Sequence, residues 1–241
     1  MSRGTFSTLQ HLLKQAYSVE VAEQQQAAIE LSNLIENAGH LLSSLVLDLN
    51  LRLGTFPAVS FGPLAHALSM LLPSTDRTVA TYSARALKAL LLDDALRPLA
   101  ISTGVPAIIL EAMNQWEDEV LVLREVLGIT QTLCWDARCV RSIVHPDSVG
   151  QLIQFVQSHD SEVSVLALAS IANVLSFCDT ILLTDSANID ALGQGMTILL
   201  QILRTVNNRS QRFYAMAAVA NACAHPRLQS ILKDNDGTHM P

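Results

Sequence analysis

An internal repeat of 42 residues constrains this chain more than any other feature. Asp76, Asp118 and Asp160 are spaced at that interval, and each precedes a long segment in which apolar residues recur three and four positions apart. This spacing places the apolar residues on one face of a helix. An aspartate before a helix can accept a backbone N–H of the first turn, so each is predicted to be an N-cap. Such repeats bury their core between neighbouring units.

The long helical segment occurs five times along the chain. A fourth copy covers 208–224, offset by 48 residues from the third, and a weaker copy covers 19–35. One position is apolar in every copy, as expected for a helix face packed against the next repeat. Its occupants are Leu31, Leu87, Ile129, Ile171 and Val219.

Two further helices are expected in each unit. The predicted second helices are 62–72, 105–113, 148–157 and 195–203, and the predicted short first helices are 97–102, 137–144 and 225–234. Gly104 allows a sharp turn between a first and a second helix. Pro98 and Pro106 fit the first turns of their helices, where a missing N–H costs nothing. Each unit is thus a short helix, a turn and two longer antiparallel helices.

At this point the chain resembles the armadillo repeat family. The segments "RPLAISTGVPAIILEAM" and "SVGQLIQFVQSHDSEVSVLALASIANVLSF" carry the resemblance, with an Arg-bearing first helix, a polar linker and an Ala-rich third helix. It is good over 76–224 and loose over 1–60, and HEAT repeats are the near alternative. The resemblance implies an all-α, right-handed armadillo-type α-solenoid of about four repeats plus a partial C-terminal repeat. It also implies that the third helices line a concave groove.

A single armadillo-like domain is predicted over 1–241. It comprises a divergent N-terminal unit (1–60), regular repeats (61–224), the start of an incomplete repeat (225–237) and a tail (238–241). Two irregularities interrupt the period: an additional helix is expected at 41–53 and an exposed loop at 184–194. The incomplete last repeat has two interpretations. The chain is a fragment of a longer protein, or its end is covered by a partner or a second copy.

The resemblance also suggests where a partner binds. Armadillo proteins use an Asn on the third helix, whose amide can both donate to and accept from an extended peptide backbone. That position holds Asn or Gln in four of the five copies, and the position two turns earlier lies on the same face. Alternatively, the amides bond neighbouring helices and the tyrosines are core residues. The predicted groove residues are Gln26, Asn33, Tyr82, Arg85, Arg124, Gln131, Asn173, Tyr214 and Asn221.

Two positions depart from the pattern. The nuclear-import branch of the family carries a Trp four residues before the Asn, and no copy has one there, so binding of a classical import signal is not expected. Glu125 occupies a position that is otherwise small. A carboxylate in a tight helix interface is costly unless it is paired. Either a local twist exposes Glu125, or it forms an ion pair with Arg124 or Arg85.

Composition limits the remaining functional classes. The net charge is −7 without a Lys/Arg cluster, which argues against nucleic acid and favours a basic protein partner if the binding surface shares the acidity. The four cysteines lack metal-site spacing and are interpreted as reduced thiols of a cytoplasmic or nuclear protein. No transmembrane segment, enzyme motif, metal site or cofactor is expected. The predicted function is a non-enzymatic protein–protein interaction scaffold; the alternative is a structural unit that self-associates through its ends, including the C-terminal end.

Overall fold

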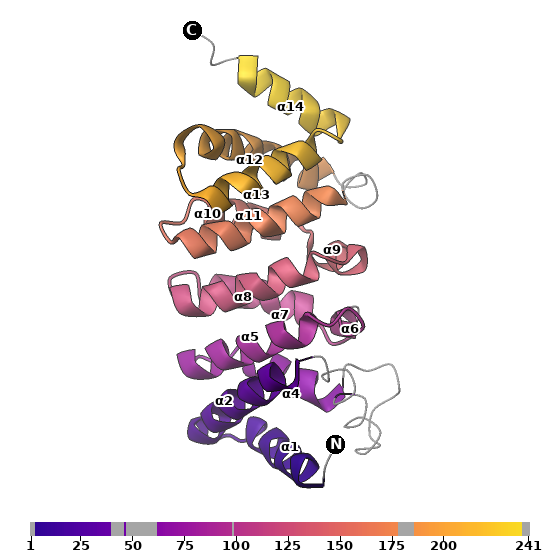
Figure 1. Cartoon of the computed structure of the whole chain (residues 1–241), viewed down its shortest axis with the longest axis vertical. Helices are drawn as coiled ribbons and strands as arrows, with labels where there is room; N and C mark the ends of the chain where they lie inside the picture. The colour runs from indigo at the N-terminus through magenta and orange to yellow at the C-terminus, as the bar shows by residue number, and fades with distance from the viewer. Residues whose placement is uncertain (1–2, 40–45, 47–61, 98, 178–185, 238–241) are drawn as a thin grey trace. The chain divides into compact units, whose positions relative to one another are not determined.

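The computed structural model describes residues 3–39, 46, 62–97, 99–177 and 186–237, and within them it contains only helices (Figure 1). Two compact units are distinguished, unit 1 (Met1–Leu133) and unit 2 (Cys134–Pro241). Unit 1 comprises α1 (Arg3–Ala16), α2 (Val21–Ala38), α4 (Gly62–Leu71), α5 (Arg77–Leu91), α6 (Leu99–Ser102), α7 (Val105–Gln115) and α8 (Val120–Leu133). Unit 2 comprises α9 (Ala137–Ile143), α10 (Pro146–Val156), α11 (Ser161–Ser176), α12 (Ser186–Thr205), α13 (Arg209–Ala222) and α14 (Pro226–Gly237).

The helices follow the order that the repeat predicts. The long third helices are α2, α5 and α8 in unit 1 and α11 and α13 in unit 2. Each packs against the preceding helix of its own repeat, as α4 does on α5, α7 on α8, α10 on α11 and α12 on α13. Neighbouring third helices also pack side by side within each unit, α2 with α5, α5 with α8, and α11 with α13 (Figure 1).

N-capping starts three of the third helices, at Asp76, Asp160 and Asn208. Asp76 accepts a hydrogen bond from Val79 N at 2.9 Å, and the side chains of Asp160 and Asn208 each accept two backbone N–H groups of the first turn. The prediction for Asp118 is wrong. Because α8 begins at Val120, Glu119 rather than Asp118 directly precedes it.

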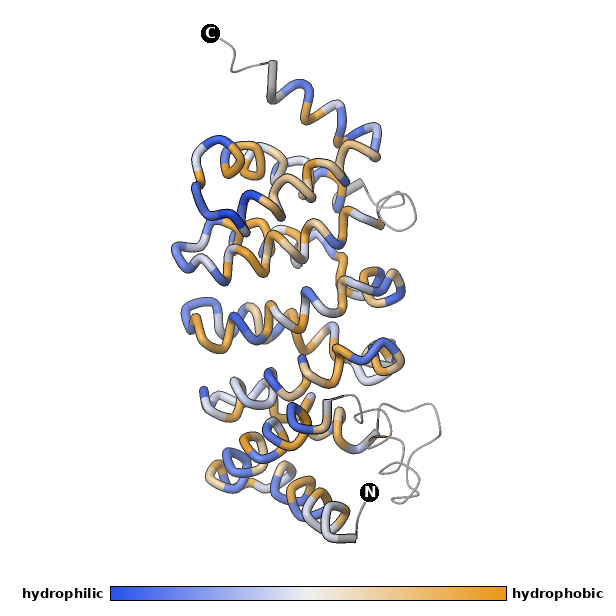
Figure 2. The backbone as a smooth tube through the Cα atoms, viewed as in Figure 1, coloured by the Kyte–Doolittle hydropathy of each residue, from blue (hydrophilic) through white to orange (hydrophobic). Residues whose placement is uncertain are grey.

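The recurring apolar position forms the core as predicted. Its occupants in α2, α5, α8 and α11 are buried, and only Val219 of α13 remains half-buried. Figure 2 shows apolar and polar residues alternating along each helix, as one-sided burial requires.

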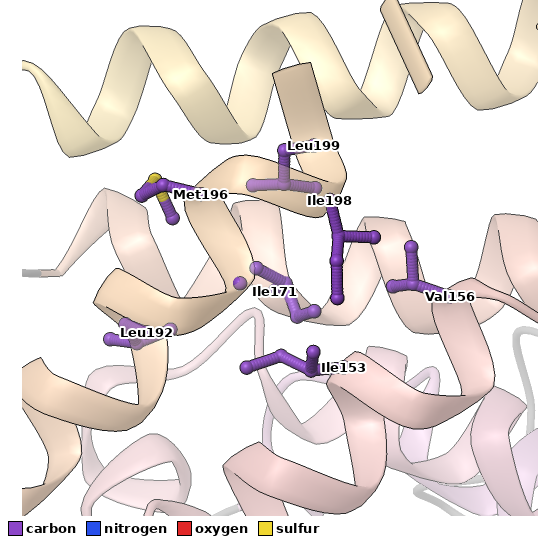
Figure 3. Close-up of a pocket in the computed structure, with 8 residues that line it drawn as sticks. Ile153, Val156, Ile171, Leu192, Met196, Ile198 and Leu199 are labelled. Atoms are coloured by element: carbon purple, nitrogen blue, oxygen red, sulfur yellow. The ribbon is translucent and has the colours of Figure 1, made fainter. Parts of the chain in front are cut away.

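The exposed loop predicted at 184–194 is wrong for the residues that the structure describes, because 186–194 belong to α12. Ile189, Leu192 and Met196 are buried at helical spacing. Gly193, the glycine within this stretch, serves helix packing, because a Cβ on it would lie 2.7 Å from Ile231 Cδ1 of α14. A Cβ on Gly195 would lie 2.9 Å from Ile153 Cδ1 of α10. Figure 3 shows the apolar side chains around this contact, which leave no room for a water molecule.

The short first helices are present with shifted limits. Gly104 has φ 73°, in the left-handed region expected at the turn, and Pro106 lies in the first turn of α7. α14 is longer than predicted and continues to Gly237. Pro98 and the helix expected at 41–53, apart from buried Val46, lie outside the described residues.

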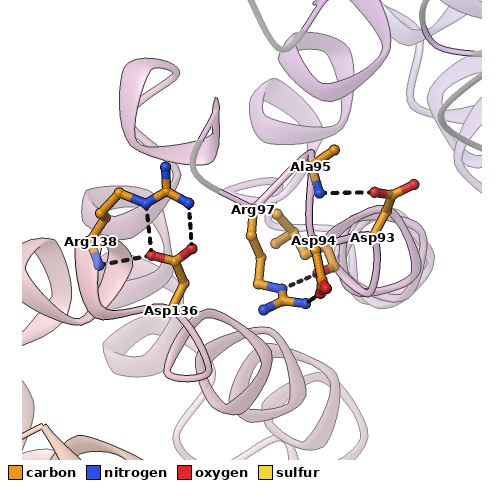
Figure 4. Close-up of polar contacts among 7 residues, drawn as sticks. Asp93, Asp94, Ala95, Arg97, Asp136 and Arg138 are labelled. Carbon is orange, nitrogen blue, oxygen red and sulfur yellow. Dashed lines mark hydrogen bonds and ion pairs between the residues drawn. The ribbon is translucent and has the colours of Figure 1, made fainter.

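Arginines anchor the segments around the first helices, each within its own unit (Figure 4). Arg97 is buried, pairs with Asp94, and its Nε donates to Leu91 O at 3.0 Å, which satisfies a carbonyl at the end of α5. In unit 2, Asp136 accepts from Arg138 N at 2.8 Å as the N-cap of α9 and also pairs with the Arg138 guanidinium. No helix among the described residues is long and apolar enough to cross a membrane.

Candidate functional site

Four charged side chains meet where the third helices of unit 1 lie together. Arg85 Nε of α5 lies 3.1 Å from Glu125 Oε1 of α8 and 4.0 Å from Glu36 Oε1 of α2, and Lys88 Nζ also bonds Glu125. We call Glu36, Arg85, Lys88 and Glu125 the ion cluster. It spans all three third helices and balances two positive with two negative charges.

Glu125 is therefore explained by pairing. Its side chain is only 13% exposed, so a local twist that exposes it is the wrong alternative. Of the two predicted candidates, Arg124 and Arg85, the observed partner is Arg85; Lys88 was missed. A Cβ on Gly128 would lie 2.7 Å from Lys88 Cδ, so this glycine leaves the space through which the Lys88 stem reaches Glu125. The glycine inside α8, three residues after Glu125, was the signal in the sequence.

The ion cluster also holds an aromatic ring. The Arg85 guanidinium carbon lies 5.3 Å from the Tyr82 ring centroid, a cation–π arrangement. Both side chains are half-buried. Since Arg85 is fixed from two neighbouring helices, Tyr82 is presented in a defined orientation with its hydroxyl unpaired in the described part of the chain.

The remaining predicted residues of unit 1 differ in their freedom to bind. Asn33 is exposed and Gln131 is half-buried, and neither side-chain amide has a hydrogen bond within the described residues. Gln26 is exposed but donates to Glu30 on its own helix. Arg124 is half-buried on α8.

In unit 2 one predicted amide joins helices instead of facing a partner. Asn221 Nδ2 donates to Ala172 O of α11 at 2.8 Å, which confirms the alternative interpretation for this residue. Asn173 is half-buried and its amide is unpaired among the described residues. Tyr214 is half-buried. Its ring lies edge-on to the ring of Phe213, with 5.2 Å between the two ring centroids.

A second side-chain bond joins the same two helices. Gln211 Nε2 of α13 donates to Ser164 Oγ of α11 at 2.8 Å, and that hydroxyl donates to Val156 O at 2.7 Å. The signal in the sequence was a serine within the predicted helix, four residues after the N-cap Asp160. Its burial is seen only in the structure.

Sequence reasoning also missed an open apolar region on α13. Phe213 and Met216 are 58% and 59% exposed. They line a hollow of about 350 Å³ with Leu203, Asn207, Arg209 and Arg212. Two large apolar residues three apart on a helix whose other face is rich in alanine were the available signal.

The buried Cys134 has a structural role, and the acidic side chains that the structure describes give no sign of a metal site. Burial, with a smaller contribution from Cys139, raises the pKa of Cys134 to about 12, so this thiol is not a nucleophile at neutral pH. Among the described residues, no group of three His, Cys, Asp or Glu side chains could hold a metal ion.

Comparison with known proteins identifies the fold through similar solved structures. No family model matches the chain, and no curated protein matches it. An engineered protein of known structure superimposes with a TM-score of 0.77 at 22% identity over 95% of this chain and 85% of its own. A designed armadillo repeat protein gives 0.74 at 16% identity, covering 94% and 87%. A second one, solved in complex with the peptide (KR)4, gives 0.74 at 16% identity, covering 95% and 88%. The chain thus has the armadillo-repeat fold.

Proposed function

We propose that this armadillo-repeat chain is a protein-binding scaffold that holds an extended segment of a partner protein on the third helices. In unit 1 the binding surface is made of Asn33, Tyr82, Arg85 and Gln131. In unit 2 it is made of Asn173 and Tyr214.

The observation that carries the proposal is the pair of unpaired amides on either side of a fixed Tyr–Arg pair. Asn33 on α2 and Gln131 on α8 flank α5, which presents Tyr82 and Arg85. An amide can satisfy both the N–H and the C=O of an extended peptide. Tyr and Arg are favoured anchors at interfaces, and anchors that are already ordered lose less entropy on binding.

Similar solved structures support the same class of function. One designed armadillo repeat protein was solved with a (KR)4 peptide, and others are described as computationally designed for modular peptide recognition. A basic partner stays a prediction for this chain. The ion cluster has no surplus of negative charge, so we assign recognition to the peptide backbone and to apolar or aromatic side chains.

Selection of displayed extended peptides against the purified chain tests the proposal. We expect the recovered peptides to lose about tenfold or more in affinity to an Asn33→Ala/Gln131→Ala variant, because two bidentate backbone contacts are removed. Asn114→Ala is the matched control, since Asn114 is an exposed amide on α7, a second helix. Peptides that bind both variants as tightly as the wild type would show that the third helices are not the binding surface.

The alternative, a structural unit that self-associates through its ends, predicts a different result. Sedimentation of the purified chain would then show concentration-dependent dimers or longer assemblies. The two functions are separable because peptide affinity and the concentration dependence of sedimentation are measured independently.

A further inference from the structure

One stripe of α11 is covered by the next third helix, and the equivalent stripe of α13 is open. Ser164, Leu168 and Ala172 lie four residues apart on α11, so they share one face. Gln211 and Asn221 of α13 bond the first and last of them, and Leu168 between them is fully buried.

The equivalent residues of α13 lie 48 positions later, as the repeat requires. They are Arg212, Met216 and Ala220, and all three are exposed. Phe213 beside them is exposed as well, and with Arg212 and Met216 it borders the hollow at the start of α13. We call Arg209, Arg212, Phe213, Met216 and Ala220 the open face. Arg212, Met216 and Ala220 occupy the repeat positions that, on α11, receive the next third helix.

The positive charge of the open face favours a bound helix that carries an acidic residue. Arg209 and Arg212 make no ion pair with any residue that the structure describes, and the first turn of α13 contains no acidic residue. The N-terminus of a helix already carries partial positive charge, so two arginines there leave an uncompensated positive end. A carboxylate bound beside them would be favoured by both arginines and by the helix end.

From this geometry we propose that the open face binds an amphipathic helix of a partner protein, with an acidic residue facing Arg212. α13 supplies the template for this partner. It places Gln211 against Ser164, and small residues follow at Ala215, Ala218 and Ala222, all fully buried. A helix on the open face places Glu or Asp where α13 has Gln211, because Arg212 replaces Ser164, and small or apolar residues four, seven and eleven positions later.

The probe for the test is a synthetic helix based on residues 208–224. It carries Gln211→Glu and Cys223→Ser, and a hydrocarbon staple replaces its residues 212 and 216, which face away from the contact and keep it helical. The matched control peptide carries Gln211→Lys. Binding to the full chain is measured by fluorescence anisotropy.

We expect the acidic peptide to bind about tenfold or more tightly than the lysine peptide, and the chain variant Arg212→Glu to reverse this preference. Phe213→Ser/Met216→Ser should abolish binding. Met70→Ser is the matched control because Met70, on α4, is 58% exposed and distant in sequence from the open face. None of these changes touches Asn33 or Gln131, so failure here is distinct from failure of the proposed function.

Three results would overturn the proposal. Neither peptide binds, both bind equally well, or binding survives Phe213→Ser/Met216→Ser. Sedimentation provides a fourth: a dimer of the chain that disappears in the same double variant would assign the open face to a second copy instead.

Discussion

In unit 1 the neighbouring third helices α5 and α8 are joined by the ion cluster, whereas in unit 2 α11 and α13 are joined by neutral hydrogen bonds. Glu125 meets two cations, while Ser164 and Ala172 each accept from one amide. Both solutions connect equivalent helices of one repeat architecture. The difference teaches that the repeat specifies the packing of the third helices, while the polar links across them are free to vary.

The largest effect is expected from reversing the charge at the centre of the ion cluster. Glu125→Lys places a third cation beside Arg85 and Lys88 in a site where the Glu125 side chain is 13% exposed. We expect a loss of about 2–4 kcal/mol in the free energy of unfolding, at the lower end of buried pairs because both cations are partly exposed. Urea denaturation, followed by Trp116 fluorescence in a Trp135→Phe background, reports on unit 1.

Glu117→Lys is the control for this change, because Glu117 is exposed in the connection before α8. It should alter the free energy of unfolding by less than about 0.5 kcal/mol. Equal effects of the two substitutions would mean that the ion cluster does not stabilise unit 1.

The second effect concerns the buried hydroxyl of unit 2. Ser164→Ala leaves the Gln211 amide and Val156 O without their partner, at a cost of about 1–2 kcal/mol. Ser170→Ala is matched, since the equally buried Ser170 bonds, among the residues that the structure describes, only Leu166 O inside α11. Hydrogen exchange should accelerate in α13 for Ser164→Ala alone. Similar acceleration in both variants would contradict a specific link between the helices.

A smaller effect separates the two amides of unit 2. Asn221→Ala removes a bond between α13 and α11 and should cost about 1 kcal/mol. Asn173→Ala should cost little, because its amide is unpaired among the described residues, yet it should weaken peptide binding. Thermal denaturation and the peptide assay, applied to both variants, check this division. If instead Asn173→Ala lowered stability and Asn221→Ala weakened peptide binding, the structural and binding roles of the two residues would be exchanged.

A smaller difference still should appear in the salt dependence of the two links. A double-mutant cycle between Arg85 and Glu125 should give a coupling of about 0.5–1.5 kcal/mol at 0.1 M salt and less at 1 M, because the Debye length falls from about 10 to 3 Å. The cycle between Gln211 and Ser164 should not change with salt. Equal salt dependence would remove the distinction between the units.

The smallest effect is an acid-dependent one from a local ion pair of unit 2. Hydrogen bonds from the Arg138 side chain hold the pKa of Asp136 below its usual range. A lowered carboxyl pKa stabilises the folded state above the unfolded pKa of about 3.9 and stops doing so as the pH falls through the folded value. The stability difference between wild type and Asp136→Asn should therefore shrink below about pH 4. A difference constant from pH 7 to 3 would contradict the pairing.

Much of the helix order was predictable because local chemistry decides it. Asp76 and Asp160 cap the helices that follow them, and Gly104 adopts the positive φ that its turn requires. The prediction of a loop at 184–194 was wrong because contacts between distant segments decide the structure there. Gly193 indicates a break by composition, but it lies inside α12 and admits Ile231 of α14, a contact that the local sequence does not reveal.

The candidate binding residues were predictable as positions but not as roles. Asn173 and Asn221 occupy one repeat position, yet within the described part of the chain only the Asn221 amide bonds a neighbouring helix. Glu125 was recognised as anomalous, but both its partners come from α5, a whole repeat earlier.

The amino-acid sequence by itself determined the repeat, the helical faces and the residues that each face can offer, because a helix arises from contacts three and four residues apart. Only the tertiary structure decided which polar groups are paired and which are left for a partner. Those outcomes depend on side chains that approach from the next helix of the unit. The open face of α13 shows the same division: its residues follow from the repeat, and their exposure follows from what packs on them.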